Sequence, residues 1–302
     1  MSAPFDIRNV KSTFIFNPKS GHNARNPYLL ERTRAFISRH RLNAELQPTS
    51  HPQHATQLAR AAVTAGAEAV ISIGGDGTLN EVARGLLDSP CPLGLIPCGS
   101  GNGLGRHLGI PKPEPFAYDA LLQGKMRSID CGTVNGHPFF NVAGLGFDAE
   151  ISARFNQLTR RGLVAYLQTT MRMWRNYQPS RSLIHHADGC LASTAFIIAI
   201  ANSDQYGNNC YIAPGARVDD GQLNLTVLER VNWLNALPLT YRLFRGSIGK
   251  STVVHRLAGK NFRIERESAL PFHTDGEVHA ATKTIEIAVH PHALKVITPR
   301  GP

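Results

Sequence analysis

Residues 69–81 read AVISIGGDGTLNE, and the fold expected of the chain follows from this stretch. Its first five residues form an apolar, β-branched run that is typical of a buried strand. The glycines that follow let the backbone come close to a polyphosphate and direct several N–H groups at it, and the helix expected to begin there adds its positive end. The stretch therefore predicts a phosphate-binding loop between a strand and a helix.

An aspartate lies within this glycine loop. Asp76 would repel a bare phosphate, so we explain it by a Mg²⁺ ion that it holds directly or through water, or by a reacting hydroxyl that it orients. The structural alternative is a tight turn with a solvated aspartate. The whole string, placed directly after a buried strand, favours the functional interpretation.

Two more loops follow expected strands in the same way. Residues 17–21 (NPKSG) come after an apolar run at 13–16, and residues 97–103 (PCGSGNG) come after one at 93–97. The structural alternatives are an ordinary turn for the first loop and a flexible crossover for the second. In a parallel sheet, ligands bind at the carboxyl ends of the strands, and all three loops leave such ends.

The helical patterns complete this first region. Amphipathic helices are expected over residues 27–40 and 55–65, between the apolar strands. Strands that alternate with helices predict a parallel sheet covered by helices on both faces, which is a three-layer α/β domain.

The pattern changes after about residue 127. Further strands are expected at residues 129–134, 139–143, 194–200, 222–228, 261–266 and 284–289, and one helical stretch at 162–177. Short strands separated by turns such as 219–221 (DDG) predict a second, mostly antiparallel β domain with a helical insertion.

Composition and charge limit the kinds of partner and site that the chain is expected to have. The 302 residues carry a net charge of +10, and no basic run or interleaved aromatic pattern indicates a nucleic-acid platform. A solvated surface and contact with an acidic membrane remain as explanations of the charge. No CxxC pair occurs among the five cysteines, so no zinc site is indicated. No secretory signal or spanning segment is recognised, and a cytosolic protein is expected.

The loops, taken in order, resemble the diacylglycerol kinase catalytic-domain family, which includes bacterial lipid kinases and sphingosine kinases. The resemblance covers nearly the whole chain and rests on six motifs: NPxxG at Asn17, GGDGTLNE at Gly74, PxGSxN at Pro97, NxxGxGFD at Asn141, DDG at Asp219 and DGE at Asp275.

The resemblance implies two domains: an ATP-binding α/β domain over residues 1–128, to which residues 291–302 return, and a lipid-binding antiparallel β-sandwich over residues 129–290. It implies ATP contacts at Asn17, Pro18, Lys19, Ser20, Gly21, Thr49, Gly74, Gly75, Asp76, Gly77, Thr78, Leu79, Asn80, Glu81 and Ser100. It implies Glu277 as the proton acceptor and Asp76 as the aspartate that organises water and metal. It implies Mg²⁺ ligands at the Asp220 side chain and the backbone carbonyls of Arg217 and Gln222.

One loop departs from the family. Residues 99–103 read GSGNG, whereas many bacterial members have GTxND, so Gly103 replaces an acidic residue and the acceptor lipid is left open. Ser100 and Asn102 supply polar side chains within reach of a nucleotide.

The leading hypothesis is a Mg-dependent, ATP-dependent kinase of a diacylglycerol-like or sphingoid lipid. Its partners would be the lipid and, transiently, an anionic membrane surface, with a homodimer left open and no nucleic acid, so a cytoplasmic protein peripheral at the membrane is expected. A kinase of a soluble acceptor, similar to NAD kinases, and a non-catalytic nucleotide- or lipid-binding regulator are the alternatives.

Overall fold

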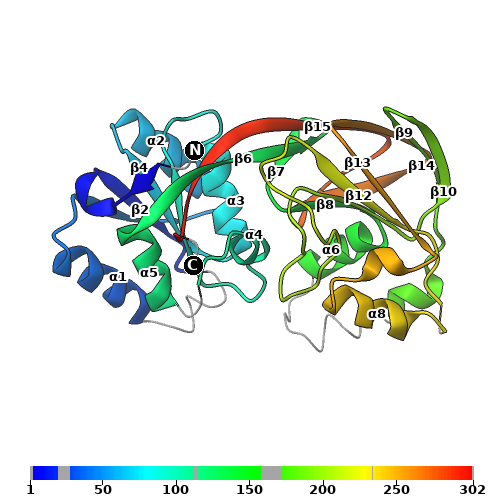
Figure 1. Ribbon diagram of the computed structural model, residues 1–302, viewed down its shortest axis with the longest axis horizontal. Helices are drawn as coiled ribbons and strands as arrows, with labels where there is room; N and C mark the ends of the chain where they lie inside the picture. Colours follow the sequence, from blue (N-terminus) through cyan, green and yellow to red (C-terminus); the bar gives the residue numbers. More distant parts are fainter. Residues whose placement is uncertain (1–2, 20–27, 112–113, 158–171, 233, 301–302) are drawn as a thin grey trace. The chain divides into compact units, whose positions relative to one another are not determined.

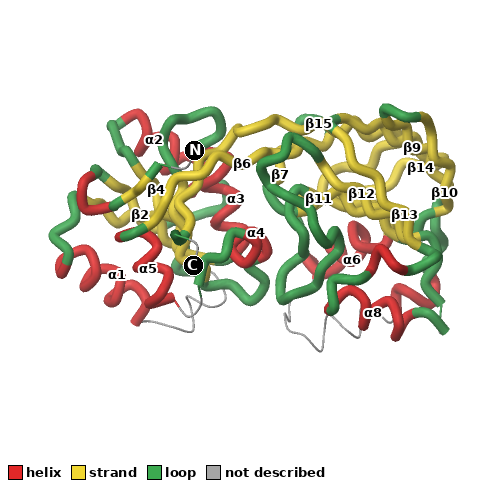
Figure 2. Tube along the Cα trace, viewed as in Figure 1, coloured by secondary structure: helices red, strands yellow, loops and turns green. Residues whose placement is uncertain are grey.

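The computed structural model describes residues 3–19, 28–111, 114–157, 172–232 and 234–300. The chain divides into two compact units (Figure 1): the N-terminal unit, Met1–Cys131 with Pro291–Pro302, and the C-terminal unit, Gly132–His290. Helices and strands alternate in the first, whereas strands dominate the second (Figure 2). Two strands, β6 (Gly124–Val134) and β15 (Glu277–Thr298), contribute residues to both units.

A parallel sheet forms the centre of the N-terminal unit. Its strands lie in the order β3-β2-β4-β5, followed by the last part of β15 beside β5, and each neighbouring pair is parallel. The bounds are β2 (Ser12–Phe16), β3 (Ala44–Pro48), β4 (Ala69–Gly74) and β5 (Leu93–Pro97). The strands expected at 13–16, 69–73 and 93–97 are confirmed. The edge strand β3 was missed because its residues, AELQP, form no continuous apolar run and none of them is fully buried.

Helices cover both faces of this sheet. On one face, α1 (Tyr28–Arg39) and α5 (Glu114–Leu122) meet through a hydrogen bond of 2.8 Å between the Thr33 and Tyr118 hydroxyls. Also in this face's core are apolar side chains of β2 and β4 such as Phe14 and Ile71. On the other face, α2 (His54–Thr64) packs so closely on α3 (Asp76–Gly85) that a Cβ at Gly85 would lie 2.6 Å from Ala59. The remaining elements are β1 (Pro4–Phe5), η1 (Ile7–Asn9) and α4 (Gly103–His107).

The C-terminal unit is built from antiparallel strands. One sheet runs β13-β12-β11-β8-β14, while β14 also pairs with β9 and β15, and β9 with β10. The bounds are β7 (His137–Phe139), β8 (Val142–Gly146), β9 (Arg181–His186), β10 (Gly189–Thr194), β11 (Ile197–Ala201), β12 (Leu223–Leu228), β13 (Val254–Gly259) and β14 (Asn261–Thr274). The helices whose bounds are described in this unit are α6 (Phe147–Gln157), α8 (Ala236–Phe244) and η3 (Ile248–Lys250). The fold class predicted from sequence, α/β followed by a β-sandwich, is confirmed.

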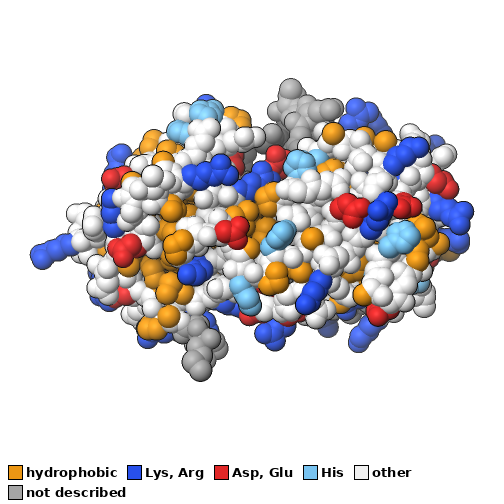
Figure 3. All heavy atoms as spheres, turned by 90° about the horizontal axis from the view of Figure 1, so that it is seen from above, with side chains coloured by type: hydrophobic (Ala, Val, Ile, Leu, Met, Phe, Trp, Pro, Cys, Tyr) orange, Lys and Arg blue, Asp and Glu red, His pale blue; other side chains and the backbone are white. Residues whose placement is uncertain are grey.

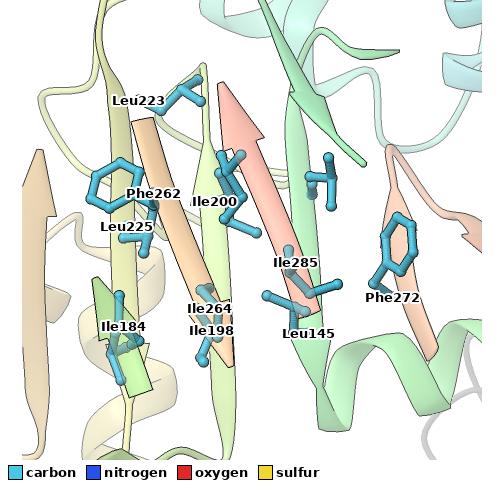
Figure 4. Packing of buried hydrophobic residues seen from close by; sticks show 14 of the residues in the cluster. Leu145, Ile184, Ile198, Ile200, Leu223, Leu225, Phe262, Ile264, Phe272 and Ile285 are labelled. Carbon is cyan, nitrogen blue, oxygen red and sulfur yellow. The ribbon is translucent and has the colours of Figure 1, made fainter. Parts of the chain in front are cut away.

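The core of the C-terminal unit lies between these strands. Branched side chains from β9, β11, β14 and β15, such as Ile184, Ile198, Ile264 and Ile285, gather in one cluster (Figure 4) and are almost entirely buried. Period-two burial along the strands explains the alternating sequence pattern, for example in the stretch 261–266.

Two expected strands of this unit are each divided in two. The stretch 139–143 breaks between β7 and β8 because the N–H groups of Phe140, Asn141 and Val142 donate to the Asp275 carboxylate, at 2.8–3.0 Å, rather than to a strand partner. The stretch 194–200 breaks between β10 and β11, which pair with different neighbours. Most of the helix expected at 162–177 lies outside the described residues, and residues 172–176 are helical.

Strand β14 changes partners along its length, and Arg266 marks the change. Residues 263–266 pair with β9, residues 272–274 pair with β8, and the register with β15 shifts between Glu265 and Leu270. Irregular backbone leaves carbonyl groups without ladder partners. The guanidinium of Arg266, 6% exposed, donates to the carbonyls of Leu270, Pro271 and Thr282. Burial lowers the pKa of Arg266 to about 10.

We predict that Arg266→Met lowers the free energy of unfolding by about 2 kcal/mol, because buried carbonyls lose their donors. The matched control is Arg263→Met on the same strand, where the side chain is 54% exposed and paired with Glu265; its effect should stay within about 0.5 kcal/mol. Urea unfolding followed by circular dichroism measures both. Equal stabilities of the two variants would contradict the structural role of Arg266.

Candidate active site

The order of the parallel strands indicates where the N-terminal unit binds a ligand. Strand β3 lies on one side of β2, and β4 lies on the other. The connections leaving β2 and β4 therefore diverge, and ligands in open parallel sheets bind at the carboxyl ends of strands at such a switch point. The loops at 17–21 and 74–78 follow these two strands.

A pocket of about 230 Å³ lies in this unit. It is lined by Asn17, Lys19, Thr49, Ser50, His51, Pro52, Ala55, Thr78 and Glu81. Five of these were predicted as ATP-binding residues: Asn17, Lys19, Thr49, Thr78 and Glu81. Because the lining residues come from the ends of two parallel strands, β2 and β3, and from the helices α2 and α3, the fold brings together side chains up to sixty-four positions apart in the sequence.

Local hydrogen bonds hold the rim of the pocket. The Asn17 side-chain oxygen accepts the Lys19 N–H at 2.9 Å, which fixes the turn after β2. The Thr49 N–H donates to the Phe16 carbonyl at 2.8 Å, so the loop after β3 follows the same strand end. The Lys19 ammonium lies 3.5 Å from the Ser50 carbonyl, a long contact that leaves this cation available to an anion.

Backbone donors are present where α3 begins. Its N-cap, Gly75, makes no side-chain capping bond, and the N–H groups of Asp76, Gly77 and Thr78 have no acceptor among the described residues. A Cβ built on Gly77 would meet nothing within 4 Å, so there is open space beside this turn. Free N–H groups at the positive end of a helix suit a phosphate group. The donor set therefore fits a nucleotide.

Asp76 fixes this loop to the next one. Its two carboxylate oxygens accept the N–H groups of Asn102 at 2.9 Å and Gly103 at 3.0 Å, at the start of α4. Asn102 has a φ of 49°, and its side chain bonds both the N–H and the carbonyl of Gly99. Gly99 in turn packs on Gly75, where a Cβ on Gly99 would lie 2.8 Å from the Gly75 Cα.

This geometry corrects one expectation about the third loop. Asn102 is 4% exposed and its side chain is engaged with Gly99, so it holds the loop rather than reaching toward a nucleotide. Ser100 is exposed and remains a predicted contact. Cys98, whose role the sequence left open, is buried and donates its thiol to the Ile96 carbonyl at 3.3 Å, which is a packing role.

The other predicted nucleotide residues are distributed as follows. Glu81 lines the pocket, but its carboxylate also accepts the Ala55 N–H at 3.1 Å and so caps α2. Leu79 and Asn80 are buried in α3, and Gly74 ends β4, where a Cβ would lie 2.6 Å from the Thr78 hydroxyl. Ser20 and Gly21 lie outside the described residues, whereas Pro18 is exposed in the turn after β2.

In the C-terminal unit, the predicted proton acceptor lies on a well-held loop. Glu277 is exposed, and it follows the turn of Asp275 and Gly276, which joins β14 to β15. The three N–H groups held by the Asp275 carboxylate fix this turn to the segment before β8. Of the two carboxyl groups in the motif DGE, that of Asp275 holds the backbone and that of Glu277 is exposed.

A buried histidine also holds this loop, and sequence reasoning did not single it out. The Gly276 N–H donates to Nδ1 of His273 at 3.3 Å, so Nε2 carries the proton and donates to Asp148 at 3.3 Å. The Tyr206 hydroxyl donates to the same Asp148 oxygen at 3.1 Å. A Cβ on Gly144 would lie 2.5 Å from His273 Nε2, so this first glycine of the motif NxxGxGFD makes room for the pair.

The predicted magnesium turn is small and exposed. Asp220 accepts the Gln222 N–H at 3.0 Å, while the Arg217 guanidinium pairs with Asp219 at 3.3 Å. One carboxylate and two backbone carbonyls form an oxygen donor set of the kind that Mg²⁺ accepts while keeping several waters. Within the described part of the chain, no three His, Cys, Asp or Glu side chains cluster as a metal site.

Comparison with known proteins identifies the family. Residues 11–134 match the diacylglycerol kinase catalytic domain, and residues 141–298 match the YegS C-terminal NAD kinase beta sandwich-like domain. A probable lipid kinase YegS-like of Chromohalobacter salexigens is 32% identical over 81% of this chain and 80% of its own length. A diacylglycerol kinase of Bacillus subtilis is 28% identical, over 88% of this chain and 89% of that protein.

A crystal structure of a putative diacylglycerol kinase from Bacillus anthracis has the same fold, with a TM-score of 0.72 at 23% identity over 95% of this chain and 97% of that one. The chain belongs to the diacylglycerol kinase catalytic-domain family, in the branch of bacterial lipid kinases. It is a kinase, a phosphotransferase that uses ATP.

We predict that Asn102→Gly weakens the binding of an ATP analogue about tenfold, because glycine keeps the left-handed backbone but loses both bonds to Gly99. Isothermal titration measures the affinity. The matched control is Asn135→Gly: Asn135 also has a positive φ, of 48°, and a bonded side chain, but belongs to the C-terminal unit. The control should change stability only. Unchanged affinity of the Asn102 variant would show that the loop does not depend on this bond.

Proposed function

We propose that the protein transfers the γ-phosphate of ATP, in a Mg-dependent reaction, to a hydroxyl group of a diacylglycerol-like or sphingoid lipid. The observation that carries the proposal is the pocket at the switch point, which Lys19 lines together with Thr78, whose N–H group at the start of α3 has no acceptor among the described residues. The membership of the family supports the lipid acceptor.

In the N-terminal unit, the proposed work is phosphate binding. The N–H groups of Gly77 and Thr78 would donate to phosphate oxygens, and the Lys19 ammonium would balance their charge. Asp76 cannot swing freely, because both of its oxygens accept backbone N–H groups. A carboxylate oxygen has further lone pairs, so Asp76 would orient water or metal from a fixed position.

In the C-terminal unit, the proposed work is proton transfer. The lipid hydroxyl oxygen would form a bond to the γ-phosphorus, the bond from that phosphorus to the bridging oxygen would break, and ADP would leave. The hydroxyl proton would pass to the Glu277 carboxylate. The turn that carries Glu277 is fixed by Asp275 and His273, which limits the positions that the carboxylate can take.

Mg²⁺, when bound, would spread the charge that develops on the phosphate oxygens. The residues proposed to hold it are Asp220 by its side chain, and Arg217 and Gln222 by their carbonyls. The exposed position of Asp220 leaves its coordination open to water.

The first test is a lipid panel. Purified protein with Mg-ATP should move labelled phosphate into an organic-extractable lipid, and mass spectrometry of the product names the acceptor. Asp76→Asn should lower the rate at least about a hundredfold, because an amide cannot accept both N–H groups and carries no charge. Label found only in water-soluble products would favour a soluble acceptor, and near-normal rates for the variant would remove Asp76 from the mechanism.

The second test concerns the proton acceptor. Glu277→Gln should lower kcat about a hundredfold or more with little change in KM for the lipid, because the amide keeps the shape but cannot take the proton. Glu267→Gln is the matched control: it changes another exposed glutamate of the C-terminal unit and should leave both constants unchanged. A change confined to KM would count against Glu277 as the base.

A further inference from the structure

Helix α8 carries an apolar stripe that faces solvent. Leu234, just before the helix, is 88% exposed, and within it Leu237, Tyr241 and Phe244 are 80%, 64% and 52% exposed. Spacings of three, four and three residues place them on one face of the helix. Four of the six large hydrophobic side chains that are exposed among the described residues therefore gather at this one segment, which we call the α8 stripe.

The opposite face of α8 already supplies the contact with the core. Leu239 is 4% exposed, and Leu239 and the partly buried Leu243 pack into a cluster with Phe147 of α6 and Leu228 of β12. The α8 stripe is therefore additional to what the fold requires. A surface helix that is apolar on both faces has a second apolar partner or lies against lipid.

The charges around α8 are of one sign. Residues 230–264 contain seven Lys or Arg residues and no Asp or Glu. Arg242, Arg245 and Lys250 form no ion pair with any described residue, and the Arg245 guanidinium lies 5.9 Å from the Tyr241 ring. One acid, Asp204, shares a groove of about 410 Å³ with Phe244 and Arg245. On the face seen in Figure 3, by contrast, basic side chains are mixed with acidic ones.

We propose that the α8 stripe docks the protein on an anionic membrane surface. The stripe would enter the boundary between headgroups and acyl chains, and Arg242, Arg245 and Lys250 would lie among anionic headgroups. A second copy of the chain fits this surface less well, because a two-fold interface would bring the same unpaired cations together. The need for such a surface rests on the proposed function, since a lipid acceptor is presented by a bilayer.

Vesicle flotation without nucleotide tests the docking. The wild type should float with vesicles of phosphatidylcholine and phosphatidylglycerol in a two-to-one ratio, and about tenfold less with phosphatidylcholine alone. Leu237→Ser with Tyr241→Ser should weaken binding to the anionic vesicles about tenfold or more. The matched control is Tyr28→Ser in α1, which removes a ring that is 66% exposed in the N-terminal unit and should bind like the wild type.

A second variant tests the charges in the same flotation experiment. Arg245→Ser with Lys250→Ser should weaken binding to the anionic vesicles about tenfold at low salt and less at high salt. Its control is Arg34→Ser with Arg39→Ser on α1, an equal loss of charge that should have a smaller effect. Full binding of the Leu237 and Tyr241 variant would overturn the proposal. So would light scattering that showed a wild-type dimer turned into a monomer by that variant, because the stripe would then be a dimer interface.

Kinase activity on detergent-solubilised lipid separates this proposal from the proposed function. The Leu237 and Tyr241 variant should keep that activity, because the substrate is delivered without a bilayer, while losing activity on vesicles about tenfold. If the protein floats with vesicles but phosphorylates no lipid, the proposed function is contradicted and the proposed docking surface is not.

Discussion

The Asp76 carboxylate is the interaction on which the N-terminal site depends. It lies in the first turn of α3 and accepts two N–H groups from the start of α4, so it ties the loop after β4 to the loop after β5. The backbones of Gly75 and Gly99 pack closely beneath this bridge. Because the carboxylate is used on the side of α4, the N–H groups of Gly77 and Thr78 are left to the open side. One acid thus leaves these backbone donors available to the proposed phosphate, although its own charge would repel that phosphate.

Other acidic residues of the motifs also accept hydrogen bonds from the backbone. Glu81 caps α2, and Asp275 holds three N–H groups before β8. These carboxylates accept hydrogen bonds from backbone N–H groups that would otherwise have no acceptor within the protein. Glu277 differs in being exposed beside such a structural acid, and its turn is additionally held by the buried His273, which also pairs with Asp148. Rigid support for an exposed carboxylate is what a general base requires.

Much of the fold and part of the candidate site could be predicted from the sequence. Buried parallel strands such as β2 and β4 have continuous apolar runs, and the glycine loops after them are local signals. The partly exposed edge strand β3 has no such continuous apolar run. The breaks at Phe140 and at residues 195–196 depend on partners far along the chain, and so do the bond from the Asn102 N–H to Asp76 and the pairing of His273 with Asp148. Long-range hydrogen bonds leave no periodic trace in sequence.

The pattern of α8 was hidden for a related reason. Its residues, ALPLTYRLF, suit a helix, yet only the packing of Leu239 and Leu243 into the core reveals that the other apolar side chains are additional. A sequence of one chain does not tell which apolar face of a helix the core uses.

A crystal structure with a non-hydrolysable ATP analogue and Mg²⁺ would show whether the start of α3 binds the phosphates. We expect the phosphates to lie at the start of α3, within hydrogen-bond reach of the Gly77 and Thr78 N–H groups and of the Lys19 ammonium, while Asp76 keeps its bonds to Asn102 and Gly103. A nucleotide bound elsewhere, with those N–H groups still facing solvent, would contradict this expectation.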